Sequence, residues 1–91
     1  MRIVAAAIRY ELIDSDEGWV DIDRRHESIR TKNAKYYTKE FRDNVRITEG
    51  FWTDTDNFVD RYTAKEIAVA ANQLIVPIEE TYLELYSEDV W

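Results

Sequence analysis

The sequence contains no cysteine, one histidine, two glycines and one proline among its 91 residues. Without cysteine the chain can form no disulfide, no thiolate nucleophile and no cysteine-ligated zinc site, and one histidine cannot supply a multi-histidine metal site. With so little glycine and proline there is no room for a low-complexity linker. We therefore expect a folded chain that carries no metal and no other cofactor.

Long apolar runs are also lacking. No stretch reaches the about 18 apolar residues of a membrane-spanning helix. The apolar start at residues 1–8 is too short for a signal peptide and runs directly into Arg9. We expect a cytoplasmic protein with no membrane partner.

The chain does have ordinary shares of hydrophobic residues, 45%, and of charged residues, 34%. At this length it can form one core and therefore one domain, residues 1–91. The formal net charge of −7 argues against non-specific binding to nucleic acid, which depends on neutralising phosphates with lysine and arginine.

The charge is unevenly distributed along the chain. Residues 1–23 carry −4, residues 24–46 carry +5, and residues 47–91 carry −8. The basic middle is compatible with binding of a small anion or with one end of a dipole that pairs subunits head to tail. It is equally compatible with a solvated helix face and nothing more.

Two hairpins are predicted from apolar runs of strand length. Residues 2–11 are rich in apolar and β-branched side chains, and residues 19–23 return after a polar turn that contains glycine. Residues 46–54 and the pair Phe58-Val59 are separated by turn formers. These segments predict an antiparallel sheet of about four strands.

Two helices are predicted from a 3.6-residue period. The first covers residues 25–43, with Asp23 placed to cap its N-terminus. The second covers residues 64–74 and follows a capping box made by Thr63 and Glu66. Its alanine-rich face predicts close packing on the sheet.

The remainder of the chain completes the fold class. Pro77 ends the second helical run, and residues 78–91 combine large apolar side chains with five acids. A tail this apolar should dock on its own core or on a partner. We expect an α+β domain in which one helix crosses the sheet between the hairpins and the other packs on one face.

Catalysis is the weaker functional hypothesis. His26 lies beside Glu27, but no motif places a serine nucleophile near them. Asp14, Asp16 and Gly18 fall short of an EF-hand loop, because the glycine comes one position early and a third carboxylate is missing. There is no glycine-rich phosphate loop. We therefore expect that the protein is not an enzyme.

A second set of residues points to a ligand. Arginines fork onto phosphate oxygens, aromatic rings stack on bases, and a side-chain amide reads a base edge or a ribose hydroxyl, so a nucleotide site needs all three. The candidate ligand-binding residues are Arg24, Arg25, His26, Arg30, Phe51, Trp52, Asn57 and Arg61.

Each of these residues also has a purely structural interpretation. Phe51 and Trp52 are more often packed in a core or a hairpin than against a ligand. Arg61 can pair with a nearby acid, and Arg24 and Arg25 can simply be solvated. The residues alone leave both interpretations open.

Several segments together resemble a family of small tailed-phage proteins. They are the first strand at residues 2–10, Arg25–Arg30, the block from Glu49 to Arg61, the Ala64-x-x-Ile67-Ala68 helix with Gln73, and Leu85–Asp89. Through that family the chain is similar to the phage anti-Thoeris inhibitors, which sequester the cyclic ADP-ribose signal made by bacterial TIR enzymes. The resemblance spans most of the chain in the same order.

The resemblance implies a function and a set of contacts. Such inhibitors bind an intact signal nucleotide without cleaving it, in pockets between subunits of an oligomer. For this chain it implies Phe51 as a base-stacking ring, Arg61 and the Arg25 segment as phosphate contacts, and Asn57 as a polar contact. The partners would be a small cyclic nucleotide and further copies of the chain, in the host cytoplasm.

The chain also departs from that family. It is shorter than typical members, Asp56-Asn57 replaces an expected glycine-containing turn, and the stretch after Gln73 runs through Pro77 instead of a basic residue or glycine. These departures affect the contacts expected near residues 57 and 73.

Three functions follow as hypotheses. The first is a phage-encoded nucleotide-sequestering inhibitor of bacterial antiviral signalling. The second is an acidic inhibitor that binds a host defence protein by mimicking nucleic acid with its C-terminal region. The third is a capsid or assembly accessory without a ligand.

Overall fold

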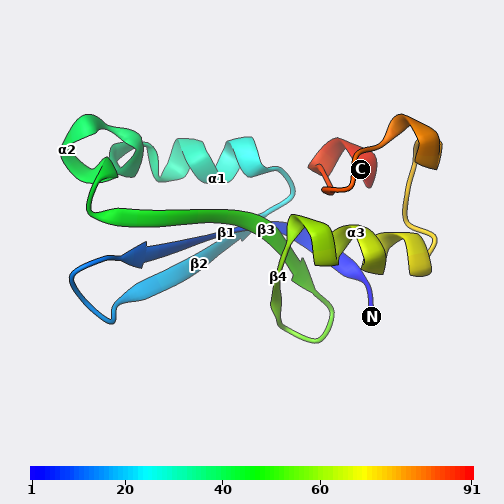
Figure 1. Cartoon of the computed structure of the whole chain (residues 1–91), viewed down its shortest axis with the longest axis horizontal. Coiled ribbons are helices and arrows are strands. Elements are labelled where there is room, and N and C mark those ends of the chain that lie inside the picture. Colours follow the sequence, from blue (N-terminus) through cyan, green and yellow to red (C-terminus); the bar gives the residue numbers. More distant parts are fainter.

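A computed structural model describes residues 1–91, the whole chain. Four strands form one antiparallel sheet in the order β2-β1-β3-β4 (Figure 1). Their bounds are Ile3–Leu12 for β1, Gly18–Asp23 for β2, Val45–Thr53 for β3 and Phe58–Asp60 for β4. Both predicted hairpins are confirmed, and β1 and β3 pair along almost their full length.

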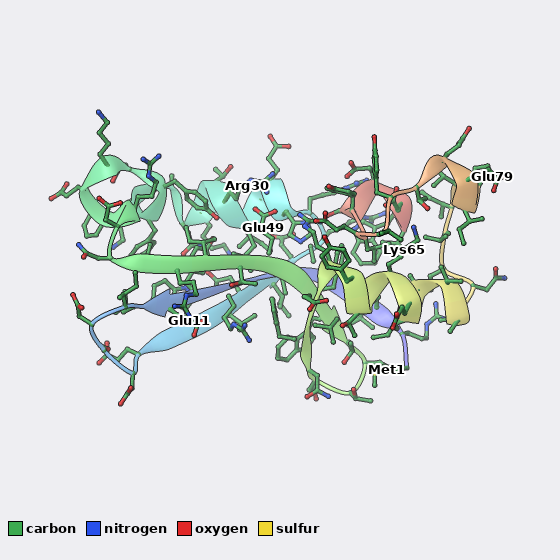
Figure 2. All side chains as sticks on the ribbon, in the orientation of Figure 1. Met1, Glu11, Arg30, Glu49, Lys65 and Glu79 are labelled. Atoms are coloured by element: carbon green, nitrogen blue, oxygen red, sulfur yellow. The ribbon has the colours of Figure 1, made fainter.

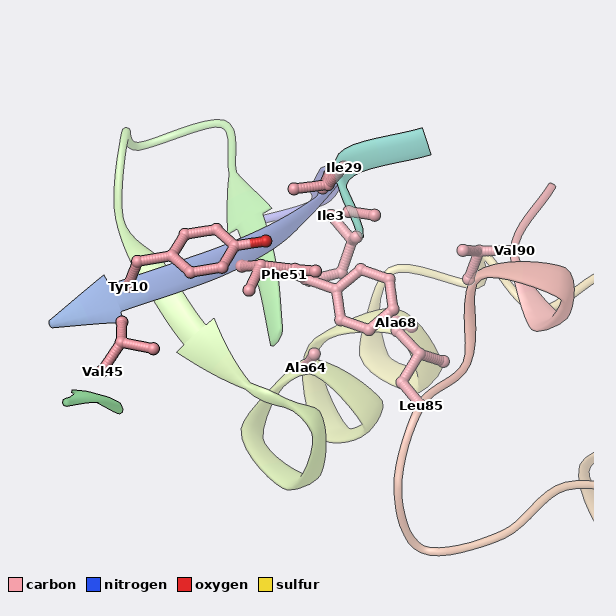
Figure 3. Packing of buried hydrophobic residues seen from close by; sticks show 11 residues of the cluster. Ile3, Tyr10, Ile29, Val45, Phe51, Ala64, Ala68, Leu85 and Val90 are labelled. Atoms are coloured by element: carbon pink, nitrogen blue, oxygen red, sulfur yellow. The ribbon is translucent and has the colours of Figure 1, made fainter. Parts of the chain in front are cut away.

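The core lies on one face of this sheet. Along β1 the side chains of Ala6, Ile8 and Tyr10 alternate inward, as the two-residue period of a strand requires, and all three are fully buried. They meet residues from the helices at His26–Lys32 and Arg61–Ala70 and from the C-terminal segment, residues 78–91, which Figure 3 shows gathered around Phe51. The fold is therefore α+β, with helices and the C-terminal segment covering one face of the sheet.

The single helix expected over residues 25–43 is wrong. The structure instead has α1 at His26–Lys32, a 3-10 turn at Ala34–Tyr37 and a short α2 at Lys39–Arg42. The Asn33 amide donates to the Ile29 carbonyl at 3.0 Å and to Asp21 on β2 at 2.8 Å, which competes with continued helical bonding. Thr38 is extended (ψ 161°) and separates the last two turns.

The expected cap of that helix is also wrong. Arg25 is the N-cap residue of α1 and makes no capping bond, while Asp23 accepts only from the backbone N–H of Arg24 at 2.6 Å. The helix is held instead by its buried residues His26 and Ile29, which pack on the sheet.

The helix α3 begins earlier than expected, at Arg61, and ends at Ala70. The proposed Thr63 capping box is wrong, because Asp60 is the N-cap and accepts from the backbone N–H of Thr63 at 2.7 Å. The C-terminal end of α3 also comes before Pro77, so the proline does not end the helix. Asn72 adopts φ 56°, and Gln73 donates its backbone N–H to the Ala68 carbonyl at 2.8 Å, as in a Schellman motif.

The alanine face of α3 packs closely on the sheet, as predicted. Ala64 and Ala68 are fully buried, and α3 contacts β1, β3 and β4. Past the helix, the Gln73 amide clamps the start of β1, accepting from the Ile3 N–H and donating to the Ile3 carbonyl, both at 2.8 Å. This clamp fixes the helix end against the strand farthest from it in sequence.

The C-terminal segment docks on the chain's own core in part. Leu85 is fully buried and Val90 nearly so, whereas Tyr82 and Leu83 stay exposed. The backbone N–H of Leu85 donates to the Arg61 carbonyl at 2.9 Å, and the Trp91 indole donates to the Arg24 carbonyl. No helix has the length and apolar character needed to cross a membrane.

Candidate functional site

A pocket of about 260 Å³ opens where α1, β3, the start of α3 and the C-terminal segment meet. It is almost entirely polar, with Tyr86 as its one large apolar ring. Its lining consists of Arg25, His26, Glu27, Arg30, Glu49, Arg61, Tyr86, Ser87 and Glu88. Segments from the two halves of the chain therefore build one site.

Glu49 organises the floor of this pocket. It faces the helices from β3, on the same side as Phe51 two residues on. Its carboxylate accepts from Arg30 at 2.7 Å and from Arg61 at 2.6 Å, one guanidinium on each oxygen. Figure 2 shows Arg30 and Glu49 side by side above the sheet.

Burial and these two bonds act on Glu49 in opposite directions. Burial raises the pKa of the Glu49 carboxyl, but hydrogen bonds from Arg61 and Arg30 outweigh it and hold the pKa below its ordinary value of 4.5. Glu49 is therefore ionised at neutral pH, and it fixes both guanidinium groups in place.

Arg61 is held from three directions. Besides Glu49, its guanidinium donates to the Leu85 carbonyl at 2.6 Å and lies 4.7 Å from the centre of the Tyr86 ring. Its side chain is only 13% exposed. Arg61 therefore joins α3, β3 and the C-terminal segment, and these contacts give it a structural role.

His26 closes the back of the pocket. Its Nε2 lies 2.7 Å from the carbonyl of Gly50 and its Nδ1 lies 2.6 Å from the hydroxyl of Ser87. Burial lowers the pKa of His26 below 6.5, so the ring is neutral at neutral pH. A carbonyl can only accept, so Nε2 carries the proton and the Ser87 hydroxyl donates to Nδ1.

Arg25 and Arg30 present the donors that remain free in the pocket. Arg25 is half-buried and takes part in none of the chain's three ion pairs. Arg30 uses only Nη1 on Glu49, and its side chain is 42% exposed. An arginine carries five N–H donors, so both residues can still grip an anion.

The structure brings four of the eight predicted site residues together. Arg25, His26, Arg30 and Arg61 all line the pocket. Phe51 lies beneath it with no exposed surface, packed edge-on against the His26 ring at 4.9 Å between centroids. Its ring is out of reach of a ligand in this structure, so it supports the site from below.

The other three predicted residues lie elsewhere. Trp52 points to the opposite face of β3, and its indole donates to Asp56 at 3.3 Å. The Asn57 amide is bonded within its own turn, to Thr55. Arg24 lines a separate hollow with Val4, Ile22 and Trp91.

Several lining residues escaped the sequence reasoning. Glu49 could have been predicted, because it lies two residues before Phe51 in a strand and therefore faces the same side of the sheet. Tyr86 and Ser87 carry none, because only the return of the C-terminal segment across the sheet brings them to the pocket.

No group of three or more histidine, cysteine, aspartate or glutamate side chains is placed to hold a metal ion. The arrangement offers forked hydrogen bonds from arginine, three carboxylates, the hydroxyl groups of Ser87 and Tyr86, one neutral imidazole and one aromatic ring.

Comparison with known protein families gives a match over nearly the whole chain. The family whose sequence model matches is described as Phage T4 y16D protein, and the match covers residues 2–91. Searches of curated proteins and of solved structures found no match.

Proposed function

The chain belongs to the Phage T4 y16D protein family, and from this premise we propose that it binds a small phosphorylated nucleotide of the cyclic ADP-ribose type. By holding this signal without cleaving it, the protein would inhibit bacterial antiviral signalling. The observation that carries the proposal is the convergence of Arg25, Arg30 and Arg61 on one pocket.

Three arginines in one pocket suit a phosphate more than a neutral ligand. Guanidinium groups match the geometry of phosphate oxygens and keep their charge at any physiological pH. Three glutamates, Glu27, Glu49 and Glu88, balance the three cations around the pocket. Binding therefore depends on directed, forked bonds and on a close fit, and less on a long-range field.

The contacts divide the residues by role. Arg25 and Arg30 hold free donors and would touch the phosphate directly. Arg61, tied to Glu49 and Leu85, would position Arg30 through their shared carboxylate. Tyr86 would offer its ring to a base or sugar, the part that Phe51 cannot take while it is buried.

Sequestration requires tight binding and no chemical step. Each molecule held by the protein is unavailable to the effector that reads it, so affinity and protein amount set the effect.

A thermal-shift titration with cyclic ADP-ribose, ADP-ribose and cyclic dinucleotides tests the proposal. A ligand that binds only the folded state raises the melting temperature. At a hundredfold excess over Kd it stabilises the folded state by about 2.7 kcal/mol. We expect Arg25→Ala and Arg30→Ala each to weaken binding at least tenfold. Chromatography of the ligand released by heat should return it intact.

Arg46→Ala is the matched control, because Arg46 is an exposed arginine on β3 outside the pocket. It should bind as the wild-type protein does. If no probe stabilises the protein, or if Arg46→Ala weakens binding as much as Arg25→Ala, the pocket is not a nucleotide site. Recovery of a cleaved ligand would replace sequestration with an enzymatic function.

A further inference from the structure

A second hollow, separate from the arginine pocket, lies between α3 and the C-terminal segment. It measures about 490 Å³ and is lined mainly by apolar side chains. We call it the C-terminal groove; its residues are Lys65, Glu66, Val69, Ala70, Ile78, Thr81, Tyr82 and Leu83. Tyr82 and Leu83 are 74% and 81% exposed, so they contribute little to this chain's own core.

The groove is preformed. The Lys65 ammonium is buried beneath it and donates to the Thr81 hydroxyl and to the Tyr82 carbonyl, which ties the C-terminal wall to α3 (Figure 2). The Thr81 hydroxyl in turn donates to the Ile78 carbonyl at 2.6 Å. An apolar wall that is fixed by hydrogen bonds and yet left in water fits a binding surface.

The rim of the groove is acidic. Glu66 lines it, and Glu79 and Glu80 are exposed on the segment that forms its outer wall. The one cation of this region, Lys65, is turned inward and already bonded. The groove therefore favours an occupant that combines apolar side chains with positive charge.

The chain carries such a surface at the other end of its long axis. Residues 32–42, here called the basic segment, present four exposed cations and one acid around the partly exposed ring of Phe41. Figure 1 shows α2 at one end of the molecule and the groove elements at the opposite end. The molecule extends 40 Å along this axis, so one chain cannot join its own two surfaces.

The basic segment lies on one side of the sheet as well as at one end of the molecule. The acidic β1–β2 turn lies at the same end as α2 but below the sheet in Figure 1, and the exposed cations of the basic segment lie on the helical side. A partner approaching end to end on the helical side therefore meets the basic segment.

We propose that the C-terminal groove binds the basic segment of a second copy of this chain. Phe41 would enter the apolar groove, and Lys39 and Arg42 would face the glutamates of the rim. Because the two surfaces differ, the contact is heterologous, and it continues from copy to copy until a ring closes or a chain grows. The proposal is independent of the nucleotide pocket.

Sedimentation velocity over a range of protein concentrations tests this contact. The average mass of the wild-type protein should rise with concentration beyond that of two chains, and it should fall as salt screens the charges. Leu83→Lys, which places a cation in the groove, should leave a monomer of 10.9 kDa. The double variant Lys39→Gln/Arg42→Gln should do the same from the other side.

An equimolar mixture of the two variants separates this contact from other modes of association. The Leu83→Lys chain keeps an intact basic segment and the double variant keeps an intact groove, so one heterologous contact remains and the mixture should stop at a dimer. Ile22→Lys, a matched change of an exposed apolar residue on the open sheet face, should associate as the wild type does. Circular dichroism checks that each variant is folded.

The proposal is wrong if the wild-type protein stays monomeric at all concentrations, as it would if the groove held a host protein instead. It is also wrong if association stops at a symmetric dimer, or if the variant mixture fails to form a heterodimer. These outcomes do not depend on whether any nucleotide binds.

Discussion

His26 joins three parts of the chain through one buried imidazole ring. It begins α1, donates to the Gly50 carbonyl on β3, and accepts from Ser87 on the C-terminal segment, 61 residues away in sequence. A second proton would place a positive charge on this buried ring, and burial disfavours that charge. The link between the sheet and the C-terminal segment is therefore sensitive to acid.

The free energy of unfolding should fall as the pH is lowered through about 6.5. Burial lowers the pKa of His26 in the folded chain below 6.5, so in that range the unfolded chain binds more protons than the folded one. The stability that the neutral His26 ring contributes is complete above the pKa of this residue in the unfolded chain. It is lost as the pH falls toward the lower pKa in the folded chain. Urea denaturation at several pH values between about 5.5 and 7.5 measures the slope.

His26→Gln is the control for this slope. Glutamine can both donate and accept but does not titrate, and the chain has no other histidine. The variant should therefore show a flatter dependence on pH in this range, whatever its absolute stability. An equal slope in both proteins would assign the pH dependence to other groups.

At the scale of elements, Asp60 caps the N-terminus of α3. Its carboxylate accepts from the backbone N–H of Thr63, and this bond lowers the pKa of Asp60 below 3.8. Asp60→Ala should lower the free energy of unfolding by about 1 kcal/mol, the usual loss for an N-cap. Thr63→Ala, the matched change three residues on, should stay within about 0.5 kcal/mol. A larger loss for Thr63→Ala would restore the capping box that the sequence favours.

Local sequence could not choose between these two starts. Asp60 and Thr63 are each followed three residues later by a residue whose N–H they can cap. The choice is made by Arg61, which must lie in the first turn of α3 to reach both Glu49 and the Leu85 carbonyl. Those acceptors lie 12 and 24 residues away, so no local pattern reveals them.

The break in the first helix has a similar origin. The period of apolar side chains continues through residues 36–41, because Tyr36 packs on Tyr10 and Trp19 of the hairpin and Phe41 packs on Tyr36. The chain meets that need with a 3-10 turn and α2 in place of one long helix, and Asn33 bonds to β2 at the break. Strands and hairpins were predictable from alternation, whereas helix ends depended on tertiary bonds.

The candidate site divides in the same way. Arg25, His26 and Arg30 share one short stretch of chain, so the sequence alone groups them as candidates. Glu49 and Arg61 join them only because β3 lies under α1 and α3. The sequence marks Phe51 as a ligand contact, but its aromatic ring is fully buried in the core.

At the scale of the whole molecule, the C-terminal segment holds one buried anchor beside an exposed leucine. Leu85 is fully buried in the core cluster, and Leu83 is 81% exposed. Leu85→Ala should lower the free energy of unfolding by about 2 to 5 kcal/mol, through lost burial and the cavity left behind. Leu83→Ala should change it by less than about 0.5 kcal/mol in the monomer.

Chemical denaturation of the two variants at low protein concentration makes this comparison. The loss at Leu85 would be a large share of the about 5 to 15 kcal/mol that holds a typical domain together. If both variants unfold at the wild-type midpoint, the C-terminal segment does not belong to the cooperative unit. If both are equally destabilised, Leu83 is packed against something in solution.

The distant ends of the chain meet through the Gln73 clamp on Ile3 and the Trp91 bond to Arg24, across 70 and 67 residues. Contacts this far apart in sequence close late, because the loop between them must first be ordered. During synthesis the arginine pocket therefore cannot exist until residues 85–88 have left the ribosome, long after Arg25 and Arg30 have emerged. A nascent chain would carry the arginines but not the site, and ligand capture would begin only once the C-terminal segment has been released and folded back.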